Sequence, residues 1–307
     1  MKVLPLIRAL PPLSPLPLPP LSRRLLPSAP TGLSLALLKA TALEVAILAG
    51  HLLLYPSGIT QERRRPATPS PGPRPAPRLP APARPPVVLL HGFIDNRSVF
   101  VLLRRTLARH GGQRVESLNY SPLTCDIRAA AALLGRHVEE ICERTGSERA
   151  DIVGHSLGGL IARYYVQRLG GDRRVRTLVT LGTPHSGTRV ARLAGAHPIV
   201  RQMRPGSEVI EELAAPAPGC RTHFVSFWSD LDHVMDPPEA ARIDHPDLSA
   251  RNVRVTGIGH LALPVHPAVA SGIRQALDLA GQDPGQGRGQ GQGETDTASR
   301  TEDMTVA

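Results

Sequence analysis

The chain has 307 residues, 32 prolines and a formal net charge of +10. The charge is uneven: residues 1–86 hold eleven Lys and Arg against two Glu, residues 281–307 hold two Arg against five acids, and residues 87–280 keep a mild +4. That excess is too small for a nucleic-acid surface. Lys2 and Lys39 are the only lysines, so residues 87–280 have no lysine to form a Schiff base or a Walker-type phosphate loop.

Composition divides the chain into five segments. Prolines crowd its front and Gly and Gln crowd its end, so one stretch in between has the pattern of a packed core. We expect a Pro-rich basic N-terminus (1–30), an apolar helix that is a membrane anchor or signal-like (31–56), a Pro/Arg-rich linker (57–86), a folded domain (87–280) and a Gly/Gln-rich disordered tail (281–307).

Residues 31–56 are long enough to cross a bilayer, but Lys39, Glu44 and His51 count against insertion. Three interpretations stay open: a transmembrane signal anchor, the apolar part of an export signal that is later removed, and an amphipathic helix that lies on a membrane or on the domain. Arginines on both sides of the segment leave its orientation undecided. The Pro-rich linker that follows predicts a semi-rigid spacer.

The domain alternates short apolar runs with helical patterns, which predicts a mostly parallel sheet with helices on both faces. Ligand chemistry in such a sheet belongs at the carboxyl ends of the strands. Asp126 and Gly146 are placed to cap the first helix. We expect strands at 87–92, 114–120, 150–154, 175–182, 222–228 and 252–259, and helices at 126–146, 157–171 and 266–280.

Cysteines and metal motifs add little. Cys125, Cys142 and Cys220 are an odd number, so at least one thiol is unpaired within the chain. The helix at 126–146 would hold the first two about 25 Å apart, too far for a disulfide. The sequence has no H-E-x-x-H or C-x-x-C, and we expect neither a metal nor a cofactor.

A G-x-S-x-G motif lies between the third strand and the second helix. It reads Gly154-His155-Ser156-Leu157-Gly158. Glycines two residues either side of a serine allow a sharp strand-to-helix turn that presents its hydroxyl. Ser156 is therefore the candidate nucleophile.

Such a serine needs an orienting acid and a base, which follow it in the order Asp or Glu, then His. The stretch after the fifth strand offers Asp232, and the loop after the sixth offers His260. We choose these two. The alternatives are Asp230 and Asp236 for the acid, and His266 for the base; His233 and His245 come too early, before the last strand.

Two backbone N–H groups must stabilise the oxyanion of the reaction. One belongs to Leu157, the residue after the nucleophile. The other comes from the loop after the first strand, where Gly92 lets the chain turn and Phe93 is the best donor. We expect Phe93 and Leu157 to form the oxyanion hole.

Five segments together, VVLLHGF, ADIVGHSLGG, LVTLGTPHSGT, FWSDLDHVM and VTGIGHLAL, resemble in sequence and order the motifs of bacterial triacylglycerol lipases and related esterases of the α/β-hydrolase fold. The resemblance covers residues 87–280. It implies an α/β-hydrolase catalytic domain with Ser156, Asp232 and His260 as the triad. His185, in the TPHSGT loop, receives no catalytic role.

The segment from Arg189 to Cys220 stands where lipases carry a lid or cap. It is short and rich in charge, so we expect a small or absent cap and a fairly open site. The sequence thus favours an ester hydrolase, lipase or esterase, acting on an ester or lipid. An acyltransferase or deacylase of a lipidated or cell-envelope substrate and a non-catalytic tethered scaffold remain alternatives. The expected location is a bacterial cell envelope, membrane-anchored or secreted.

Overall fold

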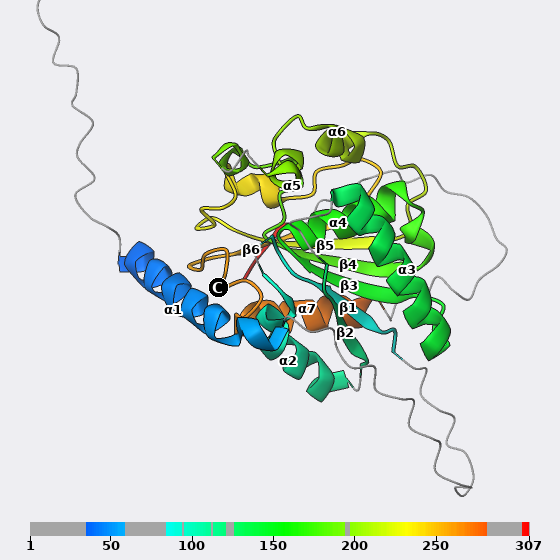
Figure 1. The fold of residues 1–307 in the computed structure, drawn as a ribbon, viewed down its shortest axis with the longest axis horizontal. Coiled ribbons are helices and arrows are strands. Elements are labelled where there is room, and N and C mark those ends of the chain that lie inside the picture. Colours follow the sequence, from blue (N-terminus) through cyan, green and yellow to red (C-terminus); the bar gives the residue numbers. More distant parts are fainter. Residues whose placement is uncertain are drawn as a thin grey trace, which may run out of the picture.

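The computed structural model describes residues 35–58, 84–93, 95–111, 113–120, 126–193, 197–280 and 303–306. At its centre is a sheet with the strand order β2-β1-β3-β4-β5-β6-β7 (Figure 1). Each neighbouring pair runs parallel. The strands are β1 (Val87–Leu90), β2 (Val115–Leu118), β3 (Ala150–His155), β4 (Val175–Leu181), β5 (His223–Ser229), β6 (Ser249–Val255) and β7 (Asp303–Val306).

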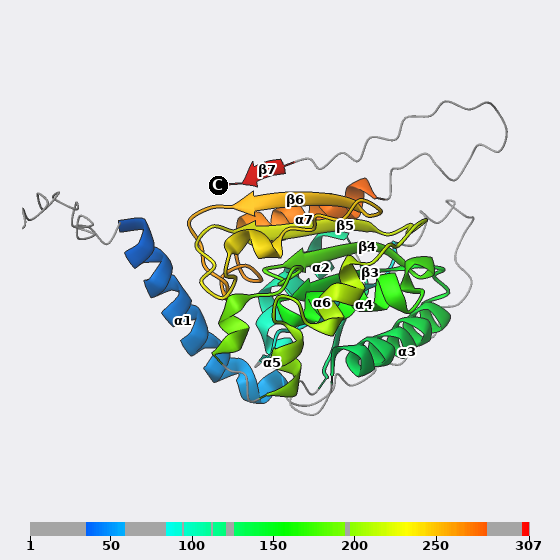
Figure 2. The same ribbon diagram turned by 90° about the horizontal axis from the view of Figure 1, so that it is seen from above.

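Helices cover both faces of the sheet, as Figure 2 shows from above. Strand β1 explains why, because its alternate side chains enter two different cores. Val88 and Leu90 pack with α3 (Ile127–Thr145) and α4 (Leu157–Arg168). Val87 and Leu89 pack with α2 (Val101–Gly111) and α7 (Pro267–Leu279). The predicted fold class is confirmed.

The caps of α3 lie where the sequence predicts them. The Asp126 side chain accepts a hydrogen bond from the Ala129 N–H at 2.6 Å, and Gly146 ends the helix with a φ of 69°. A left-handed residue at this position favours glycine. Of the three cysteines, Cys142 is buried and free, Cys220 is half-buried and free, and Cys125 lies outside the described residues.

Short helices rather than a large cap follow β4. The expected small cap consists of η3 (Arg189–Arg192), α5 (Pro198–Gln202) and α6 (Glu208–Ala214). The remaining 3-10 turns are η1 (Arg97–Phe100), η2 (Gly171–Arg173) and η4 (Pro238–Ala241).

The apolar segment near the front forms α1, from Leu35 to Gly58, which runs beside the ends of the strands in Figure 1. It lies against the domain, where its Tyr55 carbonyl accepts a hydrogen bond from the Asn96 side chain at 2.9 Å. The helix lies on the domain, as the third interpretation allows, but many of its leucines are exposed, so it is not the amphipathic helix which that interpretation named. No described helix is both long and apolar enough to span a membrane.

Strand β7 departs from the disordered tail expected for residues 281–307. It pairs in parallel with β6 at the edge of the sheet, with Asn252 opposite Asp303 and Val255 opposite Val306. The remainder of the predicted tail, the N-terminal segment 1–30 and most of the linker 57–86 lie outside the described residues.

Candidate active site

Ser156 stands at the turn between β3 and α4. Its φ of 52° and ψ of −121° make it the only non-glycine with a positive φ among the described residues. Such strain persists only where the surrounding structure enforces it, and it gathers at functional sites. The Ser156 N–H donates to the Leu181 carbonyl at 2.8 Å. The residue is only 8% exposed, so little solvent reaches it, although the short cap predicts an open site.

Three glycines around the serine are required by close contact. A Cβ on Gly154 would lie 2.5 Å from the backbone of Gly159, and one on Gly158 would lie 2.5 Å from the carbonyl oxygen of His91. A Cβ on Gly159 would lie 2.0 Å from the Thr183 hydroxyl. The motif is therefore needed here for helix α4 to pack against β1 and β4.

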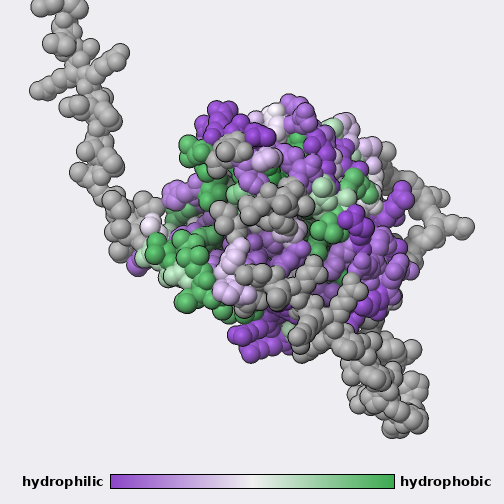
Figure 3. Space-filling view, in the orientation of Figure 1, coloured by the Kyte–Doolittle hydropathy of each residue, from purple (hydrophilic) through white to green (hydrophobic). Residues whose placement is uncertain are grey.

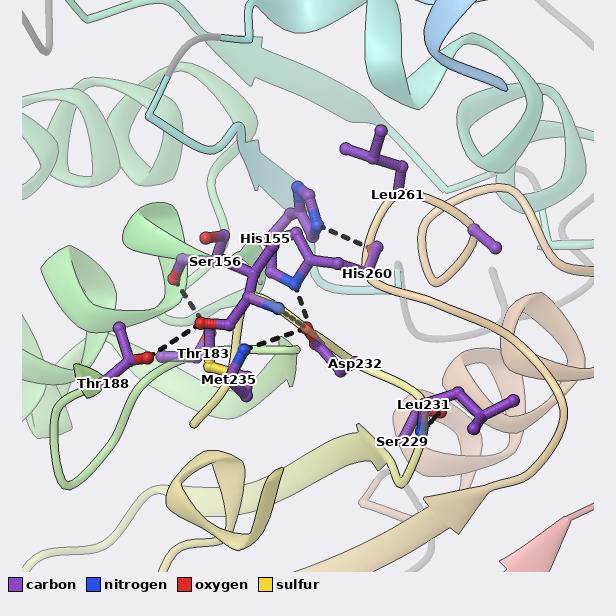
Figure 4. A network of polar contacts seen from close by, with 12 residues as sticks. His155, Ser156, Thr183, Thr188, Ser229, Leu231, Asp232, Met235, His260 and Leu261 are labelled. Carbon is purple, nitrogen blue, oxygen red and sulfur yellow. Dashed lines mark hydrogen bonds and ion pairs between the residues drawn. The ribbon is translucent and has the colours of Figure 1, made fainter. Parts of the chain in front are cut away.

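The Thr183 hydroxyl donates to the carbonyl oxygen of Ser156 at 3.0 Å, as Figure 4 shows. Thr183 follows β4, the neighbour of β3 in the sheet. The strained turn is thus held from the adjacent strand as well as from its own backbone.

Asp232 and His260 come together from the loops after β5 and β6. The Asp232 Oδ2 lies 2.7 Å from the His260 Nδ1 (Figure 4). The other oxygen, Oδ1, accepts hydrogen bonds from the N–H groups of Val234 and Met235 at 3.0 and 3.1 Å. Asp232 is 1% and His260 6% exposed, so the pair lies in a medium where charge interactions are strong.

The two partners shift each other's pKa in opposite directions. Burial alone would raise the pKa of Asp232, but the His260 ring and the two backbone N–H groups outweigh it and lower that pKa. Burial alone would lower the pKa of His260, but the Asp232 carboxylate outweighs it and raises that pKa. The geometry therefore favours a carboxylate that orients a basic imidazole.

The serine lies beside this pair. The ring of His155, its neighbour, contacts the His260 ring with centroids 4.7 Å apart, and its Nε2 lies 3.3 Å from the His260 carbonyl oxygen. Gly182, after β4, leaves room for the Asp232–His260 pair, because a Cβ there would lie 2.8 Å from Asp232 Oδ2 and 3.0 Å from His260 Nδ1. The contacts among the described residues do not include a hydrogen bond from the Ser156 hydroxyl to His260, a contact that often tightens only with substrate bound.

The two predicted oxyanion donors lie at the ends of different elements. Leu157 begins α4, so its N–H group points from the positive end of a helix. Phe93 follows β1 in a loop that Tyr120 fixes: the Tyr120 hydroxyl donates to the His91 carbonyl at 2.5 Å, and the two rings stack at 4.4 Å. Their role in an oxyanion hole stays a prediction.

The alternative acids have other partners. The Asp230 carboxylate pairs with Arg254 at 2.7 Å, and the Asp236 carboxylate pairs with Arg189 at 2.9 Å. Both pairs are largely exposed. Only Asp232 of the three contacts His260.

His266, the alternative base, and the histidines that were given no catalytic role also lie elsewhere. His185 is buried with its Nε2 2.9 Å from the Thr180 hydroxyl, and burial lowers its pKa well below the ordinary value. The Nε2 of His245 lies 3.0 Å from the Ala215 carbonyl. His266 precedes α7 as its N-terminal cap, and His233 is exposed.

Two groups at this site, Asp95 and His51, were not predicted to lie there. Asp95, after β1, has its Oδ2 3.5 Å from the His155 Nδ1 and its Oδ1 3.9 Å from the Nδ1 of His51 on α1. Burial would raise the Asp95 pKa, but His155 and His51 outweigh it and lower that pKa. Asp and Asn are common turn residues, so the sequence carries no signal for this contact.

Among the described residues, no group of three His, Cys, Asp or Glu side chains is arranged for a metal ion.

Comparisons with known proteins agree with this fold. Residues 85–204 match the family model for the α/β-hydrolase fold. A triacylglycerol lipase of Vibrio cholerae is 31% identical over 134 residues, which are 42% of this chain and 40% of that protein. A triacylglycerol lipase of Burkholderia plantarii is 29% identical over 119 residues, 36% of this chain and 32% of that protein.

Solved structures show the same fold. The mature lipase BlEst2 of Bacillus licheniformis covers 65% of this chain and 94% of its own, with a TM-score of 0.56 and 18% identity. Lipase B of Aspergillus fumigatus covers 76% of this chain and 71% of its own, with a TM-score of 0.54 and 16% identity. The chain spans about two fifths or less of the length of the curated relatives it matches. The α/β-hydrolase fold and the resemblance to bacterial triacylglycerol lipases are confirmed.

Proposed function

We propose that this chain, an α/β hydrolase by fold and similar to bacterial triacylglycerol lipases, is a serine hydrolase that cleaves carboxylic esters. One observation carries the proposal: the strained Ser156 turn lies beside a buried Asp232–His260 pair joined at 2.7 Å. Nucleophile, base and orienting acid are the three groups that acyl transfer through serine requires.

The reaction follows from these positions. The Ser156 hydroxyl attacks the ester carbonyl while the free Nε2 of His260 takes its proton, and the Asp232 carboxylate stabilises the imidazolium that forms. The tetrahedral intermediate collapses as His260 returns the proton to the leaving alcohol, which leaves an acyl group on Ser156. Water then attacks this acyl-enzyme with His260 as base, and the free acid leaves.

Charge on the intermediate needs preorganised donors. The N–H of Leu157, at the start of the twelve-residue α4, and that of Phe93 are the two we assign to the oxyanion. The aligned peptide dipoles of α4 favour negative charge at this end. Removing one such donor typically costs about 10²–10³-fold in kcat, so this pair supplies a large part of the rate.

The test is hydrolysis of a p-nitrophenyl ester series, from acetate to palmitate, by the full chain and by Ser156→Ala. We expect turnover by wild type and none above background by the variant. Ser186→Ala is the matched control, because Ser186 is exposed in the loop after β4 and its loss should leave the rate unchanged. A preference for long acyl chains would favour a lipase, and a preference for short ones an esterase.

Other outcomes would replace the proposal. Activity retained by Ser156→Ala would remove Ser156 as the nucleophile. Ester formation with an added alcohol that outcompetes hydrolysis would make the chain an acyltransferase. A folded wild type that neither hydrolyses esters nor reacts with a fluorophosphonate probe would leave a non-catalytic scaffold.

For its location, we propose a lipid surface of the bacterial cell envelope, with α1 facing the lipid. Among the described residues, exposed large apolar side chains gather on this helix, as Figure 3 shows in green. A contiguous patch of this kind marks an interaction surface. The residues are Leu43, Val45, Leu48, Leu52, Leu53, Leu54 and Tyr55.

Sedimentation with phosphatidylcholine vesicles tests this location. Leu53 is 82% exposed on α1, and Leu53→Asp should lower the fraction of protein that pellets with vesicles. Leu279→Asp is the control, because Leu279 is 54% exposed at the end of α7. Equal binding by both variants and wild type would contradict a lipid contact through α1.

A further inference from the structure

One side of α1 faces the domain, and it carries polar groups within an otherwise apolar helix. Ala40 is buried on this side and Ile47 packs against the hydrophobic core. Glu44 and His51 lie on the same side, because spacings of four, seven and eleven residues return to one face of a helix. The helix thus presents a carboxylate to the domain and leaves many of its leucines exposed.

The Glu44 carboxylate binds the loop that carries His260. Its Oε2 accepts a hydrogen bond from the Leu261 N–H at 2.9 Å, and its Oε1 accepts one from the Ala262 N–H at 2.9 Å. These are the two residues that directly follow His260 in the chain. A carboxylate with one oxygen on each of two successive N–H groups forms charge-assisted bonds and fixes the direction of the backbone.

Gly259, on the other side of His260, makes room for this contact. A Cβ at that position would lie 2.6 Å from the Glu44 Cδ and 2.8 Å from its Oε1. The three residues that bracket His260 therefore all touch one side chain, which belongs to a helix more than two hundred residues earlier in the chain.

The stability of α1 alone does not explain why Glu44 lies on the side of the helix that faces the domain. A carboxylate that leaves water costs free energy unless it gains partners, and its two partners belong to the loop after β6 rather than to α1. We infer that Glu44 is a positioning residue for His260, one that holds the loop so that the imidazole faces Ser156. This inference rests on the proposed ester hydrolase, in which His260 is the base.

The titratable groups around His260 come from four elements. Asp232 faces it from the loop after β5, Asp95 from the loop after β1, His155 from the end of β3, and Glu44 from α1. Asp232, Glu44 and Asp95 all raise the pKa of His260 against its burial, and Asp232 does so most. Removal of the Glu44 charge should therefore lower that pKa.

The test compares the full-length wild type with Glu44→Gln, which keeps the shape and removes the charge. The amide has one oxygen instead of two, so the NH2 group that replaces the other oxygen cannot accept from the N–H it faces. We expect kcat/KM to fall by about 10-fold or more, since small displacements of a catalytic group can cost up to about 10²-fold. The acid limb of the pH profile should shift to lower pH. Glu143→Gln, on the exposed side of α3, is the matched control and should change neither.

A wild-type rate and pH profile in Glu44→Gln would overturn the inference while leaving the proposed function intact. A wild type that hydrolyses no ester would instead overturn the proposed function. A rate loss without any shift of the pH profile, and with a lower melting temperature, would make Glu44 a structural group only and would also overturn the inference.

The contact itself is tested by a double-mutant cycle in thermal unfolding, which needs no activity. Gly259→Ala should lower the melting temperature when Glu44 is present, because the new methyl meets its carboxylate. A Glu44→Ala chain lacks the three atoms that would lie nearest to this methyl, so the loss should shrink. Losses that simply add would contradict a direct contact between Glu44 and the loop.

Discussion

The turn around Ser156 is held by steric contact, whereas the loop around His260 is held by charge. The turn lies where β3 meets α4. Gly154 and Gly158 face backbone and Gly159 faces the Thr183 side chain, leaving no room for a methyl group. Nothing in that set of contacts changes with pH. Its geometry is therefore fixed by volume.

The His260 loop depends instead on groups that other elements bring to it. Asp232 holds the ring from the loop after β5, and Glu44 holds the following N–H groups from α1. Each of these contacts involves a carboxylate. Added volume should therefore damage the nucleophile, whereas loss of charge should damage the base.

The largest effect on activity should come from Asp232→Asn, which changes charge and almost no volume. An amide at this position cannot stabilise the imidazolium and favours the wrong tautomer of His260. We expect kcat on a p-nitrophenyl ester to fall by about 10⁴-fold, with the fold unchanged by circular dichroism.

Asp230→Asn is its matched control, because Asp230 is exposed, two residues away and paired with Arg254. Exposed pairs of this kind contribute about 0–1 kcal/mol, so its kcat should stay near that of wild type. Equal losses in the two variants would show that the loop, and not the His260 contact, requires the charge.

A smaller effect, on stability, should follow from Gly158→Ala, which adds volume and no charge. The new methyl would lie 2.5 Å from the carbonyl oxygens of Leu90 and His91, and backbone cannot move aside as a side chain can. Overpacking of this kind costs about 1–3 kcal/mol. Chemical denaturation should show the loss, and activity should fall with it as α4 moves.

Gly50→Ala makes the same substitution where a Cβ meets nothing within 4 Å. Alanine is favoured over glycine within a helix by about 1 kcal/mol, so this variant should gain stability. A loss in Gly50→Ala equal to that in Gly158→Ala would contradict the steric account of the turn.

The turn could be predicted from sequence and the α1 contact could not, for the same physical reason. The turn is local: strand, Gly154, Ser156, Gly158 and helix follow one another, so its pattern is visible in one short stretch. The partners of Glu44 lie 217 and 218 residues away. From composition alone Glu44 only weakens a membrane span, and nothing in its surroundings indicates the N–H groups it binds.

Asp232 and His260 could be predicted in part. Their order after β5 and β6 follows from the parallel sheet, whose strand ends meet at one edge, and this part of the site was predicted. Which of three nearby aspartates contacts His260 depends on loop conformation, so chain order favoured Asp232 but left Asp230 and Asp236 as alternatives. The helix α2 was missed although its buried Leu103 and Leu107 have helical spacing, and the strand β7 was missed because it is only four residues long.

The smallest effect should be that of pH. As pH rises through the pKa of His260, kcat/KM should increase and the contribution of the Asp232–His260 pair to stability should decrease. The pKa of His260 is raised above its ordinary value of 6.5, and only the neutral ring accepts the Ser156 proton. The value of kcat/KM should therefore fall as pH drops through a pKa above 6.5. A pH profile from 5 to 9 on a soluble ester measures this limb.

Stability from the same pair has the reverse sign. A raised pKa means that the folded state favours the charged ring, so the His260 contribution is complete below pH 6.5 and is lost as pH rises through the raised pKa. The Asp232 pKa is lowered from 3.8, so its contribution is present above that pH and is lost as pH falls through the lowered pKa. The pair should stabilise the fold most between these values.

The free energy of unfolding of wild type minus that of Asp232→Asn isolates this contribution. The subtraction is needed because burial lowers the pKa of His51, His91 and His185, and these rings favour folding as pH rises. The difference should shrink between pH 6 and 9, over the range where kcat/KM climbs. A difference that stays constant would show that His260 does not change protonation against Asp232, and the electrostatic account of this loop would then fail where the steric account of the Ser156 turn still stands.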